Sequence, residues 1–279
     1  MATVSRAARR TGICLSEFGP AGSDVSARAT VLYTIAVGAR VLCRDLALTI
    51  APGELWGVLG CNGSGKTTLL HTLAGLTPAA AGRVTVAGKV LAQYSRRELG
   101  RTLGILLQRE DQEFWGSVTD YVTLGRYPHA RSLLGWSAED EDAALRALAA
   151  FDLTSLAQQS YSTLSGGERQ RARLAQLWAQ DPRIMLLDEP LQHLDLKHQL
   201  KTLELLCAAT RGAGKAAAMV LHDLTFTGRC DRVLMLYGDG RYAAGTAVEM
   251  LQAERLEGLY GCRVRACGDP GDTHFIPVI

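Results

Sequence analysis

Residues 55–67 read LWGVLGCNGSGKT, and this stretch decides the fold. The five apolar residues 55–59 predict a buried strand, and residues 60–67 fit the pattern G-x-x-x-x-G-K-[ST]. From Lys66 onward, apolar residues recur at helix spacing. A strand, a glycine-rich loop and a helix in this order predict a phosphate site, because backbone N–H groups of the loop and the helix start point at phosphate oxygens. There Lys66 would bind the β- and γ-phosphates, and the Thr67 hydroxyl would be a ligand of Mg²⁺.

Strands and helices alternate on both sides of this loop. Patterns typical of strands occur at residues 30–37, 46–50, 103–107, 184–187, 217–221 and 233–236. Helical patterns occur at 137–151 and 196–209, and a Thr246–Glu249 capping box predicts a helix to about Tyr260, before two weak strands. This alternation predicts an α/β fold with a mostly parallel sheet, into which a mostly helical stretch at about 95–180 is inserted.

The strand pattern at residues 184–187 ends in two adjacent carboxylates, Asp188 and Glu189. Neighbouring side chains of a strand point to opposite sides, so the two carboxylates need not do the same work. In P-loop NTPases an acidic residue at a strand end completes the Mg²⁺ shell, which suits Asp188. Glu189 is then the candidate to polarise the water that attacks the γ-phosphate.

Residues 164–170 read LSGGERQ and predict a second phosphate site. A serine, two glycines and Glu168 build a capped helix N-terminus that is open to an anion. It lies about a hundred residues after the first site, and nothing obliges both to bind one nucleotide within a single chain. We name residues 164–170 the signature segment.

With these segments in this order, residues 30–279 resemble an ABC-transporter ATPase subunit. The resemblance implies the ABC cassette form of the P-loop NTPase fold, with an N-terminal antiparallel β part and a helical insertion. The expected division is a poorly ordered tail at 1–28 and one ATPase domain at 29–279, with the insertion at about 95–180 and a C-terminal extension at about 243–279.

The resemblance also implies that two copies assemble head to tail, so that ATP bound to Lys66 of one copy is capped by Ser165 and Gly167 of the other. The cofactors are then ATP and Mg²⁺. The nucleotide-binding residues would be Gly60, Asn62, Gly63, Ser64, Gly65, Lys66, Thr67, Thr68, Ser165, Gly166, Gly167, Glu168 and Asp195. The Mg²⁺ ligands would be Thr67, Gln108 and Asp188, and the catalytic residues Glu189, His222, Gln108 and Lys66.

Three of these residues take their roles from matching motifs. Gln108 follows a strand pattern and matches the glutamine that contacts Mg²⁺ or water and relays nucleotide state to a membrane partner. His222, in the sequence LHD, matches the histidine that contacts the γ-phosphate. Asp195, in the sequence HLD at 193–195, matches the aspartate of the D-loop, which crosses the dimer interface.

Two positions depart from the family pattern. Val37 stands where an aromatic residue usually stacks on adenine, and Tyr33 replaces it only if the strand is shifted. Cys61 stands where proline is common, which places a thiol beside the phosphates.

Three further stretches are similar to the ATPases of bacterial importers for ferric siderophores, haem and cobalamin. They are LGRYPH at 124–129, DEPLQHLDLKH at 188–198 and LYG at 259–261. This similarity implies integral membrane permease subunits as partners and, indirectly, a periplasmic or surface substrate-binding protein. It places the chain at the cytoplasmic face of the inner (cell) membrane as a peripheral subunit.

Composition limits the alternatives. The 30 Lys+Arg and 28 Asp+Glu leave a net charge of +2, which gives a nucleic-acid partner little support. No apolar run reaches the 18 residues of a membrane span, and seven scattered cysteines without CxxC argue against a zinc site or a disulfide framework. A soluble ABC-type ATPase acting on ribosomes or DNA stays an alternative, as does an importer of another substrate class.

Overall fold

The computed structural model describes residues 28–37, 40–78, 81–108, 113–130, 135–268 and 274–278, so the expected tail lies outside it apart from Arg28. The strands are β1 (Ala29–Val37), β2 (Arg40–Ile50), β3 (Leu55–Leu59), β4 (Ala81–Val86), β5 (Lys89–Val90), β6 (Leu103–Leu106), β7 (Ile184–Leu187), β8 (Ala216–Val220), β9 (Arg232–Leu236), β10 (Tyr242–Thr246), β11 (Val264–Cys267) and β12 (His274–Pro277). The helices are α1 (Lys66–Leu73), α2 (Arg96–Thr102), α3 (Val118–Thr123), α4 (Ala138–Ala150), α5 (Gly166–Gln180), α6 (Leu196–Cys207), α7 (Leu224–Thr227), α8 (Ala247–Met250) and α9 (Ala253–Tyr260).

Six strands form the central sheet, in the order β10-β9-β3-β8-β7-β6. All neighbouring pairs are parallel except β10 with β9. Leu106 lies opposite Leu187, which in turn lies opposite Met219. The carboxyl ends of β6, β7 and β8 therefore meet at one edge of the sheet, as the predicted parallel sheet requires.

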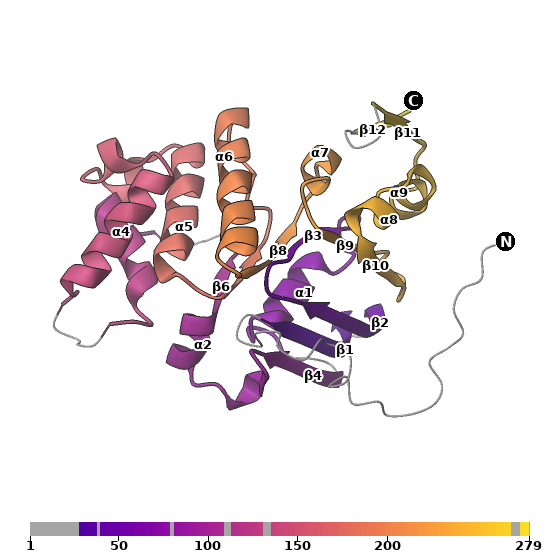
Figure 1. Ribbon diagram of the computed structural model, residues 1–279, viewed down its shortest axis with the longest axis horizontal. Coiled ribbons are helices and arrows are strands. Elements are labelled where there is room, and N and C mark those ends of the chain that lie inside the picture. The colour runs from indigo at the N-terminus through magenta and orange to yellow at the C-terminus, as the bar shows by residue number, and fades with distance from the viewer. Residues whose placement is uncertain are drawn as a thin grey trace.

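Strands β3, β7 and β8 of this sheet are buried on both faces, and the side chains of β3 and β7 alternate between two cores. On β3, Leu55 and Leu59 join one core while Trp56 and Val58 join the other. The first core also contains residues of α3, α4, α5 and α6. The second contains residues of α1 and of β1, β2 and β4, which belong to the antiparallel sheet β2-β1-β4-β5. Figure 1 shows α1 between the central sheet and β1, β2 and β4, with α4 and α5 toward the left-hand end of the view and α6 beside α5.

The expected helix from Thr246 to Tyr260 is wrong, because the chain forms two helices instead. Thr246 does cap α8 through a capping box, but Gln252 is extended and α9 begins after it. In one straight helix Met250 and Leu259 would point in opposite directions, since each residue turns the helix by about 100°. The break allows both side chains to be buried.

Strands β4, β5 and β10 were not expected from the sequence. The exposed start of β4, with Ala81, Gly82 and Arg83, lacks the apolar alternation of a half-buried strand. These strands form because they pair with β1, β4 and β9. Their positions therefore depend on neighbours that are distant in the sequence.

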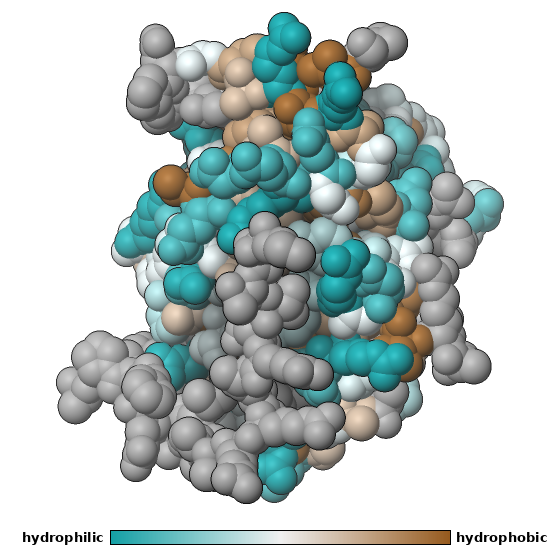
Figure 2. All heavy atoms as spheres, turned by 90° about the vertical axis from the view of Figure 1, so that its right-hand side faces the viewer, coloured by the Kyte–Doolittle hydropathy of each residue, from teal (hydrophilic) through white to brown (hydrophobic). Residues whose placement is uncertain are grey.

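Within the described ranges, none of the helices combines the length and the apolar character needed to cross a membrane. On the face seen in Figure 2, hydrophobic residues form small separate patches among hydrophilic ones. Exposed hydrophobic side chains of note include Trp115 and Tyr127, which are 81% and 66% exposed and flank α3.

A buried ion pair joins the helices of the inserted stretch. Arg126 Nε donates to Asp140 Oδ1 at 3.0 Å, and Arg126 Nη1 donates to the carbonyl oxygen of Ala179 at 2.9 Å. Burial acts to raise the pKa of Asp140, but hydrogen bonds from Ser137 and Arg126 outweigh it and hold this pKa below its usual value. Arg126 thus connects the N-terminus of α4 to the end of α5.

Replacing Arg126 by Met should lower the free energy of unfolding by about 3–5 kcal/mol at pH 7, because it leaves the Asp140 carboxylate buried without its partner. The pKa of Asp140 is depressed in the folded protein, so the pair stabilises above the unfolded pKa of about 4 and is lost as pH falls through the folded pKa. Urea unfolding at pH 7 and pH 3 measures both effects.

The control is Arg211→Met, which removes the exposed pair with Asp231 and should cost less than about 1 kcal/mol. Equal losses for Arg126→Met and Arg211→Met would contradict the role given to the buried pair.

Candidate functional site

The phosphate loop lies between β3 and α1 and is tightly folded. A Cβ added at Gly60 would lie 2.4 Å from Ser64 Oγ and 2.5 Å from the Leu236 carbonyl oxygen, so no other residue fits there. Gly65, with φ 105°, immediately precedes α1 and has no side chain to cap it. The free N–H groups at the start of α1 therefore face the loop interior, where an anion satisfies them.

Lys66 reaches back across this loop. Its Nζ donates to the carbonyl oxygens of Gly60 at 2.8 Å and Cys61 at 3.1 Å, and the residue is only 7% exposed. Burial lowers the pKa of Lys66, while the negative charges of Glu189 and Asp188 act to raise it. A buried cation held over a loop of N–H groups is suited to bind a polyanion.

A cavity of about 510 Å³ opens beside the loop. It is lined by Asn62, Gly63, Gly65, Lys66, Thr67 and Thr68 from the loop and α1. Leu42 of β2, Gln108 and Glu189 complete its walls. Residues that are far apart in the sequence are thus brought together around one cavity, as the motif analysis predicts.

Asp188 follows β7 and is 1% exposed. Neither of its carboxylate oxygens has a hydrogen-bond partner among the described residues. Burial raises the pKa of Asp188, and the nearby Thr67 hydroxyl opposes this rise without reaching hydrogen-bond geometry. Two unsatisfied buried oxygens beside a hydroxyl fit a divalent cation that is held by few protein ligands and by phosphate.

The residues present thus fit Mg²⁺ bound together with a nucleotide rather than alone. In the described part of the chain, no cluster of three or more His, Cys, Asp or Glu side chains is placed to hold a metal. Mg²⁺ commonly binds through one or two carboxylates together with substrate phosphates. Thr67 and Gln108 line the cavity, and Asp188 lies buried near Thr67, so these three residues would be the protein groups that hold it.

Glu189 is the centre of a polar cluster at the same edge of the sheet. Gln108 Nε2 donates to Glu189 Oε1 at 3.0 Å, and His222 Nε2 lies 2.7 Å from the same oxygen. The other oxygen, Oε2, is buried without a hydrogen-bond partner in the described structure. Glu189 has a left-handed backbone with φ 52°, which is strained for a non-glycine residue and occurs often at functional sites.

The signature segment forms the N-terminus of α5. Ser165 is the N-cap: its Oγ accepts from the backbone N–H of Glu168, and Glu168 Oε2 accepts from the Ser165 N–H at 2.9 Å. Ser165 Oγ also donates to Glu168 Oε2 at 2.6 Å, and this bond, together with that from the Ser165 backbone N–H, lowers the pKa of Glu168. A Cβ added at Gly166 would meet no atom of the described residues within 4 Å, so the helix end is open on that side. Ser165, Gly166, Gly167 and Glu168 do not line the cavity of the phosphate loop.

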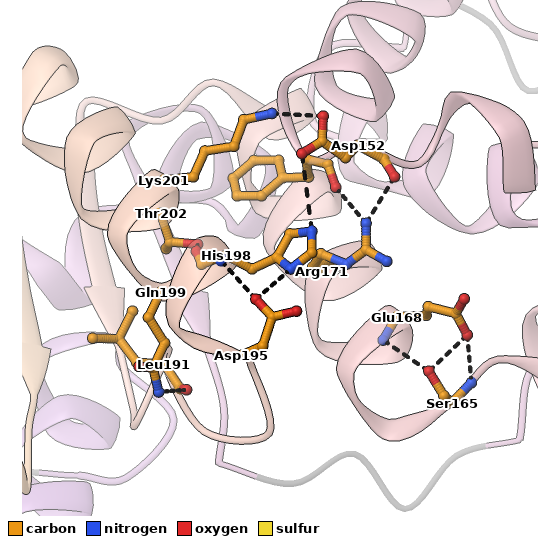
Figure 3. A network of polar contacts seen from close by, with 11 residues as sticks. Asp152, Ser165, Glu168, Arg171, Leu191, Asp195, His198, Gln199, Lys201 and Thr202 are labelled. Carbon is orange, nitrogen blue, oxygen red and sulfur yellow. Dashed lines mark hydrogen bonds and ion pairs between the residues drawn. The ribbon is translucent and has the colours of Figure 1, made fainter.

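The D-loop, residues 193–195, lies directly against the signature segment. A Cβ added at Gly167 would lie 2.9 Å from the carbonyl oxygen of His193. Asp195 caps α6, since its Oδ1 accepts from the backbone N–H of His198 at 2.9 Å. Figure 3 shows Asp195 and the Ser165–Glu168 pair at neighbouring helix ends. Asp195, like the signature segment, is absent from the described lining of the cavity.

Two buried residues of α5 were missed by sequence reasoning. Gln170 Nε2 donates to the carbonyl oxygen of Pro190 at 2.9 Å. Arg173 donates to Gln170 Oε1 at 2.9 Å and to the carbonyl oxygen of Leu107. These bonds tie α5 to the residues beside Gln108 and Glu189. The only signal in the sequence was a polar pair at i, i+3 on an otherwise buried helix face.

Of the two positions that depart from the family pattern, the structure describes the side chain of Cys61 but not that of Val37. Cys61 is exposed at the loop, and its Sγ donates to the carbonyl oxygen of Leu259 at the end of α9. Val37 and Tyr33 lie in β1, but their side chains are outside the described part of the chain.

The sequence pattern of the ABC transporter family matches residues 43–192. The chain is 40% identical to the ferric enterobactin transport ATP-binding protein FepC of Escherichia coli, over 85% of this chain and 88% of FepC. It is 39% identical to the hemin import ATP-binding protein HmuV of Pseudomonas fluorescens, over 85% and 93% of the two chains. The petrobactin import ATP-binding protein FpuD of Bacillus anthracis is 33% identical, over 86% and 89%.

Solved structures agree with the sequence relatives. A transporter assigned to the metal-chelate type, in an inward-facing conformation, has a TM-score of 0.77 and 26% identity, covering 91% of this chain and 98% of that chain. The ATP-binding cassette MJ0796, in a dimeric post-hydrolysis state bound to ADP and Pi, has a TM-score of 0.70 and 25% identity, covering 79% and 98%. The fold is the expected ABC cassette, and the chain belongs to the ABC transporter family as an ATP-binding subunit.

Proposed function

We propose that this chain hydrolyses ATP to power a membrane importer of a metal chelate of the haem, ferric siderophore or cobalamin class. The observation that carries the proposal is the cluster of Gln108, Glu189 and His222 at the cavity that holds buried Lys66. The names of FepC, HmuV and FpuD, which concern ferric enterobactin, hemin and petrobactin, support the substrate class.

Each residue of the cluster has a distinct task in this proposal. Gln108 and His222 hold Glu189 through its Oε1 at the wall of the cavity, where the Glu189 carboxylate would accept a proton of the attacking water. Lys66 stabilises negative charge that develops on the β- and γ-phosphates, and His222 contacts the γ-phosphate. Mg²⁺, held by Thr67, Asp188 and Gln108, would supply neutralisation of phosphate charge.

A second copy of the chain completes the site in this proposal. Ser165 and Gly167 lie at a helix end separate from the cavity of the same chain, so they are free to cap the nucleotide of another copy. Gly166 and Glu168 complete that helix end, and Asp195 would cross the interface beside it. Hydrolysis therefore requires a head-to-tail dimer with two composite sites.

The permease would dock on the inserted stretch, at the cytoplasmic face of the cell membrane. Exposed Trp115 and Tyr127 flank α3 between Gln108 and the signature segment, and they provide apolar area for such a contact. A periplasmic or surface binding protein would deliver the chelate to the permease. The proposed cassette comprises residues 29–279, with its insertion at about 95–180 and its extension at about 243–279.

Replacing Glu189 by Gln should leave ATP binding intact and lower the turnover number at least about a hundredfold, because the water loses its proton acceptor. The variant should also accumulate as an ATP-bound dimer. Phosphate release and light scattering measure the two effects, with the exposed Glu204→Gln as a control. Wild-type turnover in Glu189→Gln would remove Glu189 from catalysis.

Thiol reagents should label Cys61 and inactivate the enzyme, and Mg-ATP should slow the labelling, because the exposed thiol lies at the mouth of the phosphate loop. Mass spectrometry of labelled peptides measures the rate at Cys61. Cys61→Ser is the control, since its activity should resist the reagent. Equal labelling of Cys61 with and without Mg-ATP contradicts the assigned position of the nucleotide.

Replacing Arg173 by Met should lower the turnover number more than it changes the KM for ATP, because α5 loses its bond beside Gln108 while the phosphate loop is untouched. The free energy of unfolding should fall by about 1–3 kcal/mol, since the carbonyl of Leu107 and Gln170 Oε1 lose a donor. ATPase kinetics and urea unfolding test this. Arg173→Lys is the matched variant, which keeps the positive charge but loses the planar guanidinium group that donates to both acceptors. Full activity in Arg173→Met would refute the role given to the bond between α5 and Leu107.

A further inference from the structure

A second cavity, of about 890 Å³, lies at the edge of the central sheet where the parallel strands begin. Thr102, Arg183 and Lys215 line it, and they immediately precede β6, β7 and β8. Backbone hydrogen bonds fix this edge: the Arg183 N–H donates to the Thr102 carbonyl oxygen at 3.0 Å, and the Ala216 N–H donates to that of Arg183 at 2.9 Å. The phosphate loop lies at the opposite edge, where the strands end. We name the cavity lined by Thr102, Arg183, Lys215 and residues of α2 the second cavity.

Two arginines of α2 are held together at the wall of the second cavity. Arg97 Nε and Arg101 Nε donate to one acceptor, the carbonyl oxygen of Pro128, at 3.1 and 2.7 Å. Each guanidinium group carries further N–H donors, which this single oxygen does not satisfy. Two positive charges at one neutral acceptor repel each other, and a nearby anion removes that cost. We name Arg97, Arg101 and Arg183 the cavity arginines.

The second cavity keeps an excess of positive charge when its ion pairs are taken into account. Its described lining contains two carboxylates, Glu98 and Asp181. Glu98 pairs with Lys89 at 2.8 Å, and Asp181 pairs with Lys215. Among the described residues, no carboxylate pairs with a cavity arginine. Three guanidinium groups around one cavity are therefore without a counter-charge in the part of the chain that the structure describes.

We propose that the second cavity is a binding site for a small phosphate compound, whose oxygens accept hydrogen bonds from Arg97, Arg101 and Arg183. Guanidinium groups form strong paired hydrogen bonds with phosphate oxygens. The inference goes beyond the proposed function and does not rest on it, because the second cavity shares no described residue with the cavity that holds Lys66.

The arrangement of the donors favours phosphate over other anions. A phosphoryl group is tetrahedral and accepts hydrogen bonds from several directions, whereas a carboxylate accepts mainly in its own plane. The cavity arginines come from a helix and from a strand start, so their donors belong to two separate elements. The described lining contains no Leu, Ile, Val, Met, Phe or Trp. The second cavity therefore suits a soluble anion rather than the acyl chains of a lipid.

The test measures binding of inorganic pyrophosphate, without Mg²⁺, to the full-length Lys66→Ala chain, in which the phosphate loop has lost its cation. Isothermal titration calorimetry should show saturable binding. Adding Arg97→Gln and Arg101→Gln together should weaken it at least about tenfold, because charge-assisted hydrogen bonds are lost. Arg183→Gln should weaken it by a similar factor, and this side chain has no hydrogen bond in the described structure that its loss would break.

The matched control is Arg96→Gln, which removes the same charge from an exposed position of α2 outside the described lining of the second cavity. At about 0.15 M salt, where charges are screened over about 8 Å, this variant should change the dissociation constant less than about threefold. With Lys66 intact, the melting temperature and the affinity for Mg-ATP should be the same in all the arginine variants and in the wild type.

Citrate is the second probe, because it is a polyanion of similar charge that carries carboxylates instead of phosphoryl groups. It should bind at least about tenfold more weakly than pyrophosphate, since fewer of the donors reach its oxygens.

Each contrary result has a defined meaning. Absence of pyrophosphate binding, or unchanged binding in either the Arg97→Gln/Arg101→Gln or the Arg183→Gln chain, overturns the site. Equal weakening by Arg96→Gln also overturns it, because the arginines then act only through the charge of the surface. Citrate binding as tight as that of pyrophosphate overturns the phosphate class. All of these results leave the proposed ATP hydrolysis standing, which the turnover of Glu189→Gln tests separately.

Discussion

The parallel pairing of β3, β8, β7 and β6 is the constraint on which the rest of the structure depends. Because these strands run in one direction, the segments that follow them meet at one edge of the sheet. The phosphate loop, Gln108, Glu189 and His222 come from four different strand ends, yet Glu189 binds both Gln108 and His222. The helices and the antiparallel strands bury the two faces of this sheet and leave its carboxyl edge open for chemistry.

Asp188 and Glu189, the two carboxylates after β7, are adjacent in the sequence but lie in different environments. Asp188 is buried, and both of its carboxylate oxygens lack a hydrogen-bond partner among the described residues, which is costly unless a cation binds. Glu189 takes a left-handed backbone conformation that directs its side chain into the cluster with Gln108 and His222. Unsatisfied oxygens and backbone strain persist only where the surrounding structure enforces them, and both occur at this edge of the sheet.

Local patterns were sufficient to predict the parts of the fold with a periodic or capped sequence. The strand before Gly60, helix α1, the strand before Asp188 and the capping boxes of α4 and α5 all depend on residues close in the sequence. Contacts over long separations could not be found in this way. The bond from Arg173 to Leu107 and the approach of Gly167 to His193 arise only once α5 packs on the sheet. The break between α8 and α9 likewise follows from the need to bury both Met250 and Leu259.

The near-neutral net charge of the chain is consistent with this arrangement, because its affinity for phosphate is local. Lys66 and the N-terminus of α1 supply positive potential at the cavity, and the N-terminus of α5 supplies it at a separate place. Neither helix N-terminus by itself can enclose a nucleotide on all sides. In the proposed dimer, the N-terminus of α5 and the D-loop would reach the partner copy together, so contacts that fix α5 relative to the D-loop would favour assembly. The contacts of Arg171, Asp152 and His198 provide such a connection.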